Sequence, residues 1–187
     1  MDVFELIVVG GGASGFMSAI TAAENQVKKI IILESTNKLL EKVRISGGGR
    51  CNVTNASWVP SEFIHNYPRG GKKLIESFSR FATGDVFDWF QDKGVKLKIE
   101  DDLRVFPISD TSLDIVNCLK NTAQNMGIEI STKKFVKKIE RDSKENLFKV
   151  FISKNEFLLS KKLLISTGGH SSGHRLAESL GHRIIKP

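Results

Sequence analysis

The feature that most constrains the fold is a cluster of glycines near the N-terminus. Residues 10–15 spell a G-x-G-x-x-G pattern that directly follows an apolar run at residues 4–9. Apolar residues at helical spacing come next, and a second apolar run, residues 30–33, ends at Glu34. Because continuous apolar runs are typical of the inner strands of a parallel sheet, residues 4–34 are predicted to form one strand–helix–strand unit.

The glycines of this first turn each have a physical reason in a dinucleotide-binding unit. Gly10 permits a tight turn, Gly12 lets the backbone approach a pyrophosphate, and Gly15 lets the helix pack closely on the strand. The helix N-terminus adds unpaired amides and a positive dipole. Glu34 can accept hydrogen bonds from both hydroxyls of a ribose, and its charge repels a 2′-phosphate, which argues against an NADP-like nucleotide. The alternative is a glycine turn that serves packing alone.

A second glycine cluster lies within residues 37–71, a stretch without regular periodicity. So long an irregular segment is usually functional or mobile. Residues 47–49 are all glycine, and because glycine raises the entropy cost of folding, stability does not explain them. Close approach of the backbone to a flat or charged ligand would explain these glycines. The alternative is a flexible surface loop. Arg44 and Arg50 can pair with phosphate or stabilise an anionic reduced ring, and Asn52 can donate and accept hydrogen bonds.

The remainder of the chain completes the predicted architecture. Residues 134–160 indicate an antiparallel meander, and residues 163–165 a short buried strand that runs into a third glycine turn at 167–169. The fold class is therefore α/β, a Rossmann-like parallel sheet with helices on its faces plus an antiparallel β-meander. We expect one domain over residues 1–187, with an irregular glycine-rich insertion at about 37–71.

The charge balance restricts the partners. The chain has 28 Lys and Arg against 21 Asp and Glu, a formal net charge of +7, which favours phosphate-bearing partners. A nucleotide cofactor and nucleic acid both fit that charge. The lysine pairs are scattered rather than arranged in one stripe with interleaved aromatics, so no nucleic-acid partner is expected.

Cysteine usage and hydropathy bear on the compartment. Cys51 and Cys118 form no CxxC pair and have no histidines at ligand spacing, so neither a disulfide framework nor a metal site is predicted. A reducing cytoplasm fits best. No run approaches the roughly 18 apolar residues that indicate a membrane span, so no membrane partner is expected.

Together these motifs resemble one known family. The turn at 10–15, Glu34, residues 46–55, Val105-Phe106-Pro107 and the turn at 167–169 occur in the same order in the bacterial BaiN/YhiN-like flavoproteins. The most specific element is Ser46-Gly47-Gly48-Gly49-Arg50-Cys51-Asn52, and the similarity covers essentially the whole chain. The family consists of FAD-dependent oxidoreductases with a two-dinucleotide-binding-domain architecture.

The resemblance implies roles for particular residues. The first glycine turn would hold the FAD pyrophosphate, Glu34 the adenosine ribose, and the backbone of Val136 would read adenine. The second glycine loop would run beside the flavin, with Arg50 and Asn52 near its ring; no catalytic acid or base is assigned. The candidate cofactor-binding residues are Gly10, Gly12, Ala13, Ser14, Gly15, Glu34, Arg44, Ser46, Gly47, Gly48, Gly49, Arg50, Asn52, Val136, Thr167, Gly168 and Gly169.

The expected function is the FAD-binding portion of a flavoprotein oxidoreductase that acts on a small organic substrate, with NAD(P)H open as the electron donor. Family members are longer and carry a second, substrate domain and a C-terminal segment, and neither is expected in this sequence. Three alternatives stay open: a module that binds the cofactor but is catalytically incomplete, an NAD-binding dehydrogenase fragment, and a basic RNA-binding protein.

Overall fold

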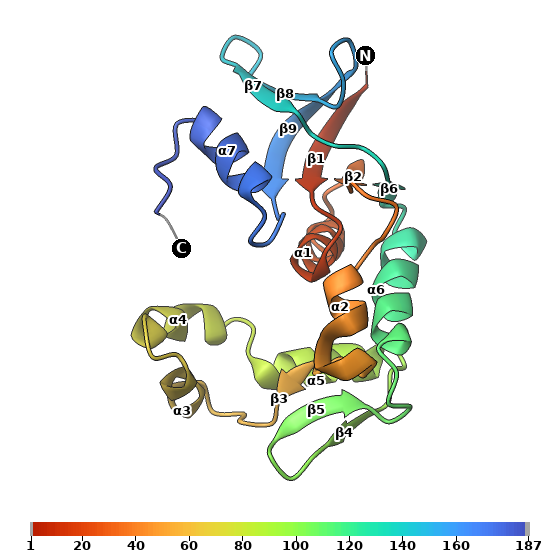
Figure 1. The fold of residues 1–187 in the computed structure, drawn as a ribbon, viewed down its shortest axis with the longest axis vertical. Helices are drawn as coiled ribbons and strands as arrows, with labels where there is room; N and C mark the ends of the chain where they lie inside the picture. Colours follow the sequence, from red (N-terminus) through yellow and green to blue (C-terminus); the bar gives the residue numbers. More distant parts are fainter. Residues whose placement is uncertain (1, 186–187) are drawn as a thin grey trace. The chain divides into compact units, whose positions relative to one another are not determined.

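The computed structural model describes residues 2–185, which form two compact units (Figure 1). One unit comprises the chain up to Glu41 together with the chain from Leu119 onward, and the other comprises Lys42–Cys118. The sequence predicts a single domain over residues 1–187. The contacts divide the chain between residues 41 and 42, in the segment that lacks regular periodicity, and between residues 118 and 119, within a helix. Each unit is therefore described by itself.

The first unit is built on a six-stranded mixed sheet. Its parallel part joins β6, β2, β1 and β9, and its antiparallel part joins β9, β8 and β7. In chain order the strands are β1 (Val3–Val9), β2 (Ile30–Leu33), β6 (Glu129–Ser131), β7 (Lys138–Asp142), β8 (Leu147–Phe151) and β9 (Phe157–Ile165).

Strand β9 is one continuous strand that serves both parts of this sheet. Its first residues pair antiparallel with β8, while its later residues pair parallel with β1, with Leu6 opposite Lys162. The sequence instead predicts two separate strands on either side of residues 161–162. The reason for the difference is that Lys161 and Lys162 are exposed, so they interrupt the apolar pattern without interrupting the backbone pairing.

Helices cover this sheet and complete its core. Helix α1 (Ala13–Glu24) buries Phe16, Ala19 and Ile20. The core contains Ile7 and Val9 of β1, Ile139 of β7 and Val150 of β8, packed with Leu176 of α7 (Ser171–Ser179). No helix within residues 2–185 is long and apolar enough to cross a membrane.

The second unit contains short helices around a small antiparallel sheet of order β3-β5-β4. Val105 and Phe106 of the central strand are fully buried. Much of the stretch predicted to be irregular, residues 37–71, is helical, although every segment in it is short.

The elements of the whole second unit are, in chain order, α2 (Glu41–Ile45), η1 (Ser46–Gly49), β3 (Thr54–Asn55), α3 (Pro60–Phe63), η2 (Ile64–Asn66), α4 (Gly71–Phe78), α5 (Thr83–Asp92), β4 (Leu97–Ile99), β5 (Arg104–Pro107) and the start of α6 (Leu113–Asn125).

Candidate functional site

Two glycines of the first turn are required by packing within the chain. Gly10 has φ +117°, and a Cβ there would lie 2.5 Å from the carbonyl oxygen of Ser166. A Cβ on Gly15 would overlap the carbonyl oxygen of Gly10. The positive φ of Gly10 and its contact with the residue that follows β9 account for glycine there, and the close approach of α1 to the turn accounts for Gly15.

Gly12 differs from these two glycines. Its backbone is extended, with φ −92° and ψ −175°, a conformation that any residue adopts. A Cβ on Gly12 would meet no atom of residues 2–185 within 4 Å. Nothing in the described chain therefore requires glycine at this position, and the open space beside its backbone is what a closely approaching ligand needs.

That open space lies at the N-terminus of α1. Gly12 is the N-cap residue, and the first helical hydrogen bond runs from Phe16 N to Gly12 O over 3.0 Å. The amides of Ala13 and Ser14 precede this bond, so the helix itself offers them no acceptor. Both residues are exposed, and no side chain of the described residues caps the helix. Free amides and the positive end of the helix dipole make this position suited to an anionic group.

Glu34 lies at the end of β2 and is tied to the same turn. Its Oε2 accepts a hydrogen bond of 2.9 Å from the amide of Gly11, and its Oε1 accepts one of 2.8 Å from the amide of Thr36. The hydroxyls of Ser35 and Thr36 also donate to Oε1. Burial raises the pKa of the carboxyl, but these hydrogen bonds outweigh burial, so the pKa of Glu34 lies below its ordinary value. The side chain is a fixed negative charge with acceptor capacity remaining.

Val136 lies in the segment between β6 and β7. Its side chain is buried in the core, and its neighbours anchor the backbone: Lys134 N donates to Glu34 O, and Lys137 N donates to Phe151 O. Among residues 2–185 the amide of Val136 donates to no other backbone group. The segment thus presents a free amide while its ends are fixed to Glu34 and to the meander.

The third glycine turn follows β9. Gly168 has φ +61°, which favours glycine, and a Cβ on Gly169 would meet no described atom within 4 Å. The hydroxyl of Ser166 donates to Val9 O and Gly10 O at 3.1 and 3.2 Å, which ties the ends of β9 and β1 together. Thr167 then packs against Gly173 of α7, where a larger residue would overlap the threonine hydroxyl.

The first unit therefore gathers most of the predicted residues at one edge of its sheet. The strands β1, β2 and β9 are parallel neighbours, so the residues that follow them lie at the same carboxyl edge. This is where ligands bind in open α/β sheets. The residues gathered there are Gly10, Gly12, Ala13, Ser14, Gly15, Glu34, Thr167, Gly168 and Gly169, and Val136 belongs to the same unit.

The second glycine loop belongs to the other unit. Gly47, Gly48 and Gly49 all have positive φ, at 54°, 67° and 88°. A Cβ on Gly48 or Gly49 would meet no described atom within 4 Å, whereas one on Gly47 would lie 3.1 Å from the ring of Phe106. The Ser46 hydroxyl donates to Val43 O at 2.8 Å. Open backbone is thus presented at the two later glycines only.

The polar side chains of this loop point toward their own unit. Arg50 is paired with Glu100 and Asp110, and its guanidinium lies 3.9 Å from the ring centre of Phe106. The amide of Asn52, oriented to satisfy both of its ends, donates to Thr54 O at 2.9 Å and Val105 O at 3.3 Å. The sequence predicts Arg50 and Asn52 to face a ligand, but these bonds engage both side chains within residues 42–118. Arg44 lies in α2, and its carbonyl accepts from the Ser112 hydroxyl.

Cys51 follows this loop as a buried thiol. Burial raises its pKa, and a hydrogen bond with Ser46 only partly offsets that effect. The thiol is therefore protonated at neutral pH and is a poor nucleophile.

Four residues of these sites could not be found from the sequence, because each contacts a residue that is distant from it along the chain. They are Ser166, Glu100, Asp110 and Ser112.

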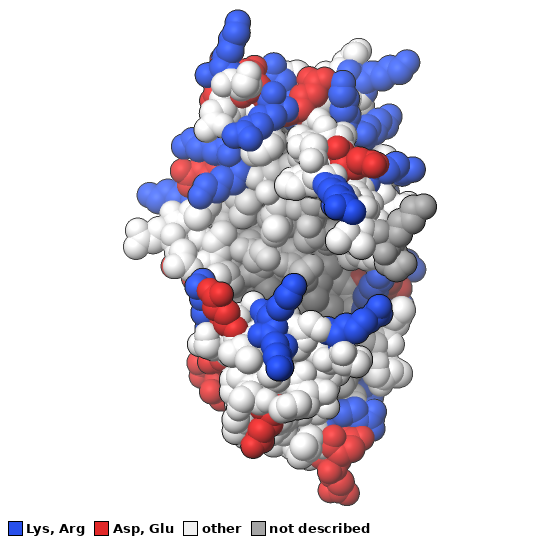
Figure 2. All heavy atoms as spheres, turned by 90° about the vertical axis from the view of Figure 1, so that its left-hand side faces the viewer, with Lys and Arg blue, Asp and Glu red and all other residues white. Residues whose placement is uncertain are grey.

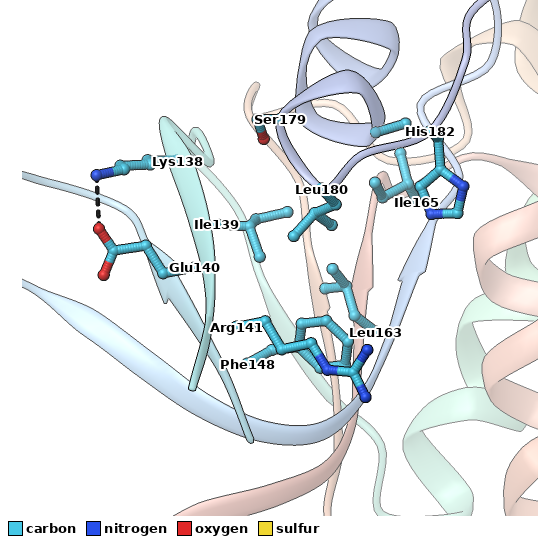
Figure 3. A pocket seen from close by; sticks show the side chains of 11 residues that line it. Lys138, Ile139, Glu140, Arg141, Phe148, Leu163, Ile165, Ser179, Leu180 and His182 are labelled. Carbon is cyan, nitrogen blue, oxygen red and sulfur yellow. Dashed lines mark ion pairs between the residues drawn. The ribbon is translucent and has the colours of Figure 1, made fainter. Parts of the chain in front are cut away.

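A cavity of about 840 Å³ lies elsewhere in the first unit, between α7 and the meander. Its apolar lining includes Ile139, Leu163, Ile165 and Leu180, and Figure 3 shows their side chains directed into it. The Lys138–Glu140 ion pair lies at one side of this group (Figure 3). None of the candidate cofactor residues lines this cavity.

Comparison with known proteins identifies the family. The model of the HI0933-like protein Rossmann domain matches residues 4–187. The chain belongs to this family. The BaiN/YhiN-type resemblance drawn from the sequence motifs is thereby confirmed, and so is the Rossmann-like α/β fold class.

Curated relatives are similar over nearly the whole chain. A ribosomal RNA dihydrouridine synthase of Haemophilus influenzae is 26% identical over 192 residues, which cover 98% of this chain and 47% of the relative. A 3-dehydro-bile acid delta(4,6)-reductase of Clostridium scindens is 26% identical over 185 residues, covering 95% of this chain and 44% of that protein. The chain thus spans about half the length of these relatives.

A solved structure shares the fold. A flavocytochrome c3 fumarate reductase in an open conformation superposes with a TM-score of 0.65 over 90% of this chain and 34% of that protein, at 20% identity. This likeness concerns the fold alone.

Proposed function

We propose that this chain is the FAD-binding portion of an oxidoreductase that acts on a small organic substrate. The observation that carries the proposal is the open space beside Gly12, at the N-terminus of α1, with the Glu34 carboxylate bonded to the same turn. A pyrophosphate needs close backbone approach and free amides, and a ribose needs a nearby acceptor. The residues present therefore fit the adenosine diphosphate part of FAD.

Each candidate residue has a role in this proposal. The amides of Ala13 and Ser14 bind the pyrophosphate, with Gly10, Gly12 and Gly15 shaping the turn, and Glu34 accepts from the ribose hydroxyls. The free amide of Val136 supports an adenine contact, and the turn of Thr167, Gly168 and Gly169 is placed over the dinucleotide. In the other unit Ser46, Gly47, Gly48 and Gly49 are assigned to the flavin, with Arg44, Arg50 and Asn52 as their supports.

The chemistry divides between cofactor and protein. FAD, when bound, supplies hydride and electron transfer, while the chain binds it and fixes its orientation. The charge of Glu34 disfavours a 2′-phosphate at the ribose, so NADPH is a poor occupant of this site. NAD(P)H acting from another position is the proposed electron donor.

The substrate and the compartment belong to the same proposal. The bile acid reductase among the relatives supports a small organic substrate, although that protein is about twice as long as the matched region. Cys51 and Cys118 are both buried, and neither forms a disulfide within residues 2–185, which agrees with a reducing cytoplasm.

The test compares Gly12→Val with Gly15→Val. Valine at position 12 enters open space, so it is expected to block phosphate approach and leave the melting temperature near that of the wild type. Valine at position 15 overlaps the Gly10 carbonyl and is expected to lower the melting temperature. Binding of FAD and of ADP is measured by titration calorimetry. A Gly12→Val protein that binds both nucleotides like the wild type would overturn the proposal.

A second candidate is an RNA substrate. One curated relative is named a ribosomal RNA dihydrouridine synthase. Although the lysine pairs of this chain are scattered along the sequence, one segment has a clear excess of basic over acidic residues. Residues 133–162, which contain the meander, hold 10 of the 28 basic residues and 4 of the 21 acidic ones. Figure 2 shows lysine and arginine side chains gathered over the part of the first unit that carries the meander.

Salt dependence separates the two candidates. Binding to a structured RNA that weakens steeply as salt rises, and weakens further in Lys133→Glu/Lys162→Glu, would favour an RNA substrate. RNA binding that is absent at low salt would contradict it and leave the small-substrate proposal in place.

A further inference from the structure

We propose that Arg50 is a positioning residue, which holds the three-glycine loop in shape through Glu100, Asp110 and Phe106 and leaves the backbone of Gly48 and Gly49 to contact the ligand. The inference rests on the proposed function in its last step, the contact with FAD. Its first step, the shape of the loop, stands on the structure of residues 42–118 alone.

The loop needs external support. Three consecutive residues, Gly47, Gly48 and Gly49, hold positive φ, and Cys51 follows with φ 62° although it is not glycine. Glycine loses more backbone entropy on ordering than any other residue, and a non-glycine residue in the left-handed region adds strain. Such a conformation persists only where surrounding contacts determine it.

Arg50 supplies the main support. Its Nη1 lies 2.6 Å from Glu100 Oε1 and 3.3 Å from Asp110 Oδ1, which joins the loop to the ends of the β4–β5 hairpin. Its guanidinium covers the ring of Phe106 at 3.9 Å, and Gly47 packs on the same ring. Both ends of the glycine run are therefore held against one fully buried aromatic side chain.

Ser112, the residue before α6, also holds the loop. Its amide donates to Gly49 O at 2.7 Å, and its hydroxyl donates to Arg44 O at 2.6 Å. Ser112 thus engages the carbonyls of Gly49 and Arg44. Arg50 engages the side chains of Glu100, Asp110 and Phe106. What remains open is the backbone of Gly48 and Gly49, beside which no described atom would meet a Cβ.

The alternative is direct contact between the Arg50 guanidinium and the bound cofactor. The ion pairs argue against it, because two carboxylates already compete for the guanidinium. Glu100 distinguishes the two roles. If Arg50 acts through Glu100, then Glu100→Gln weakens FAD binding as Arg50→Met does, and the double variant is no worse than either single one. If Arg50 touches the cofactor, Glu100→Gln frees the guanidinium and leaves binding unchanged or tighter.

The matched control is Arg104→Met. Arg104 lies in the same cluster, 5.4 Å from the centre of the Phe106 ring and 3.8 Å from Glu100 Oε2, but it belongs to β5 and not to the loop. The variant removes the same charge. It is expected to leave the loop and FAD binding as in the wild type.

The experiment has two measurements on the whole chain. Hydrogen exchange without nucleotide reports the loop: amides 47–51 are expected to exchange at least about tenfold faster in Arg50→Met and Glu100→Gln, with partial rescue in Arg50→Lys. Calorimetry with FAD and ADP reports the ligand: both variants are expected to raise the Kd for FAD on the order of tenfold and to leave the Kd for ADP unchanged.

The outcomes separate the claims. Unchanged hydrogen exchange of amides 47–51 in both variants overturns the positioning role. The role is also overturned if the Glu100→Gln protein binds FAD as tightly as the wild type while the Arg50→Met protein binds it more weakly. A wild-type chain that binds neither ADP nor FAD contradicts the proposed function, and the exchange result then decides the role of Arg50 on its own.

Discussion

The Glu34 carboxylate accepts a hydrogen bond of 2.9 Å from the amide of Gly11. This bond joins the end of β2 to the glycine turn after β1, so the acid and the turn are held at a set distance. In the proposed function a ribose would use the same carboxylate as acceptor, so a bound nucleotide would share or replace the Gly11 amide as its partner.

Glu34→Gln tests this carboxylate through pH. Its pKa is below the ordinary value of 4.5, so its hydrogen bonds stabilise the folded chain fully above that value and less as pH falls through the lowered pKa. The melting temperature of the wild type is expected to exceed that of Glu34→Gln at pH 7 and to converge with it in acid. A difference that persists unchanged at pH 3 would contradict this prediction.

Gly15→Ala tests the packing of α1 on the first turn. The added Cβ overlaps the carbonyl oxygen of Gly10, so we expect a loss of roughly 1–3 kcal/mol in unfolding free energy. Gly12→Ala is the control, expected to stay within about 0.5 kcal/mol of the wild type because its Cβ enters open space. Urea unfolding measures both, and equal losses in the two variants would show that the turn is packed differently.

Ser112→Ala removes the hydroxyl that bonds Arg44 O. The serine is 2% exposed, whereas Arg44 is exposed, so the variant removes one partly buried hydrogen bond. A loss of about 0.5–1.5 kcal/mol in unfolding free energy is expected. The control is the neighbouring Thr111→Ala, which is half-buried and whose hydroxyl accepts from the nearby Leu113 amide at 3.3 Å. A Ser112→Ala protein as stable as that control would argue against this role of the Ser112 hydroxyl.

Cys51 is expected to resist alkylation. Burial raises the pKa of its thiol, so little thiolate forms at pH 7.5. Peptide mass spectrometry after iodoacetamide treatment should find Cys51 unmodified in the folded chain and modified in urea. Rapid modification of the folded protein at neutral pH would contradict the burial.

Much of the first unit could be predicted from the sequence. Continuous apolar runs place β1 and β2, and the glycines between them place the turn and the start of α1. The continuity of β9 could not be predicted, because Lys161 and Lys162 break the apolar pattern while the backbone pairing to β1 continues through them.

The second glycine loop shows the limit of local patterns. Its glycines are recognisable from composition, but the partners of Arg50 lie 50 and 60 residues further along the chain, at Glu100 and Asp110. No periodicity links those positions to the loop. Sequence reasoning therefore predicts a ligand-facing arginine where the fold supplies two carboxylates and an aromatic ring.

The most direct measurement of the central claim is a titration of the purified wild-type chain with FAD, followed by fluorescence and calorimetry, beside the same titration of Gly12→Val. We expect saturable binding of one FAD by the wild type, competition by ADP, and loss of both in the variant. Failure of the folded wild-type chain to bind FAD, or equal binding by the two proteins, would contradict it.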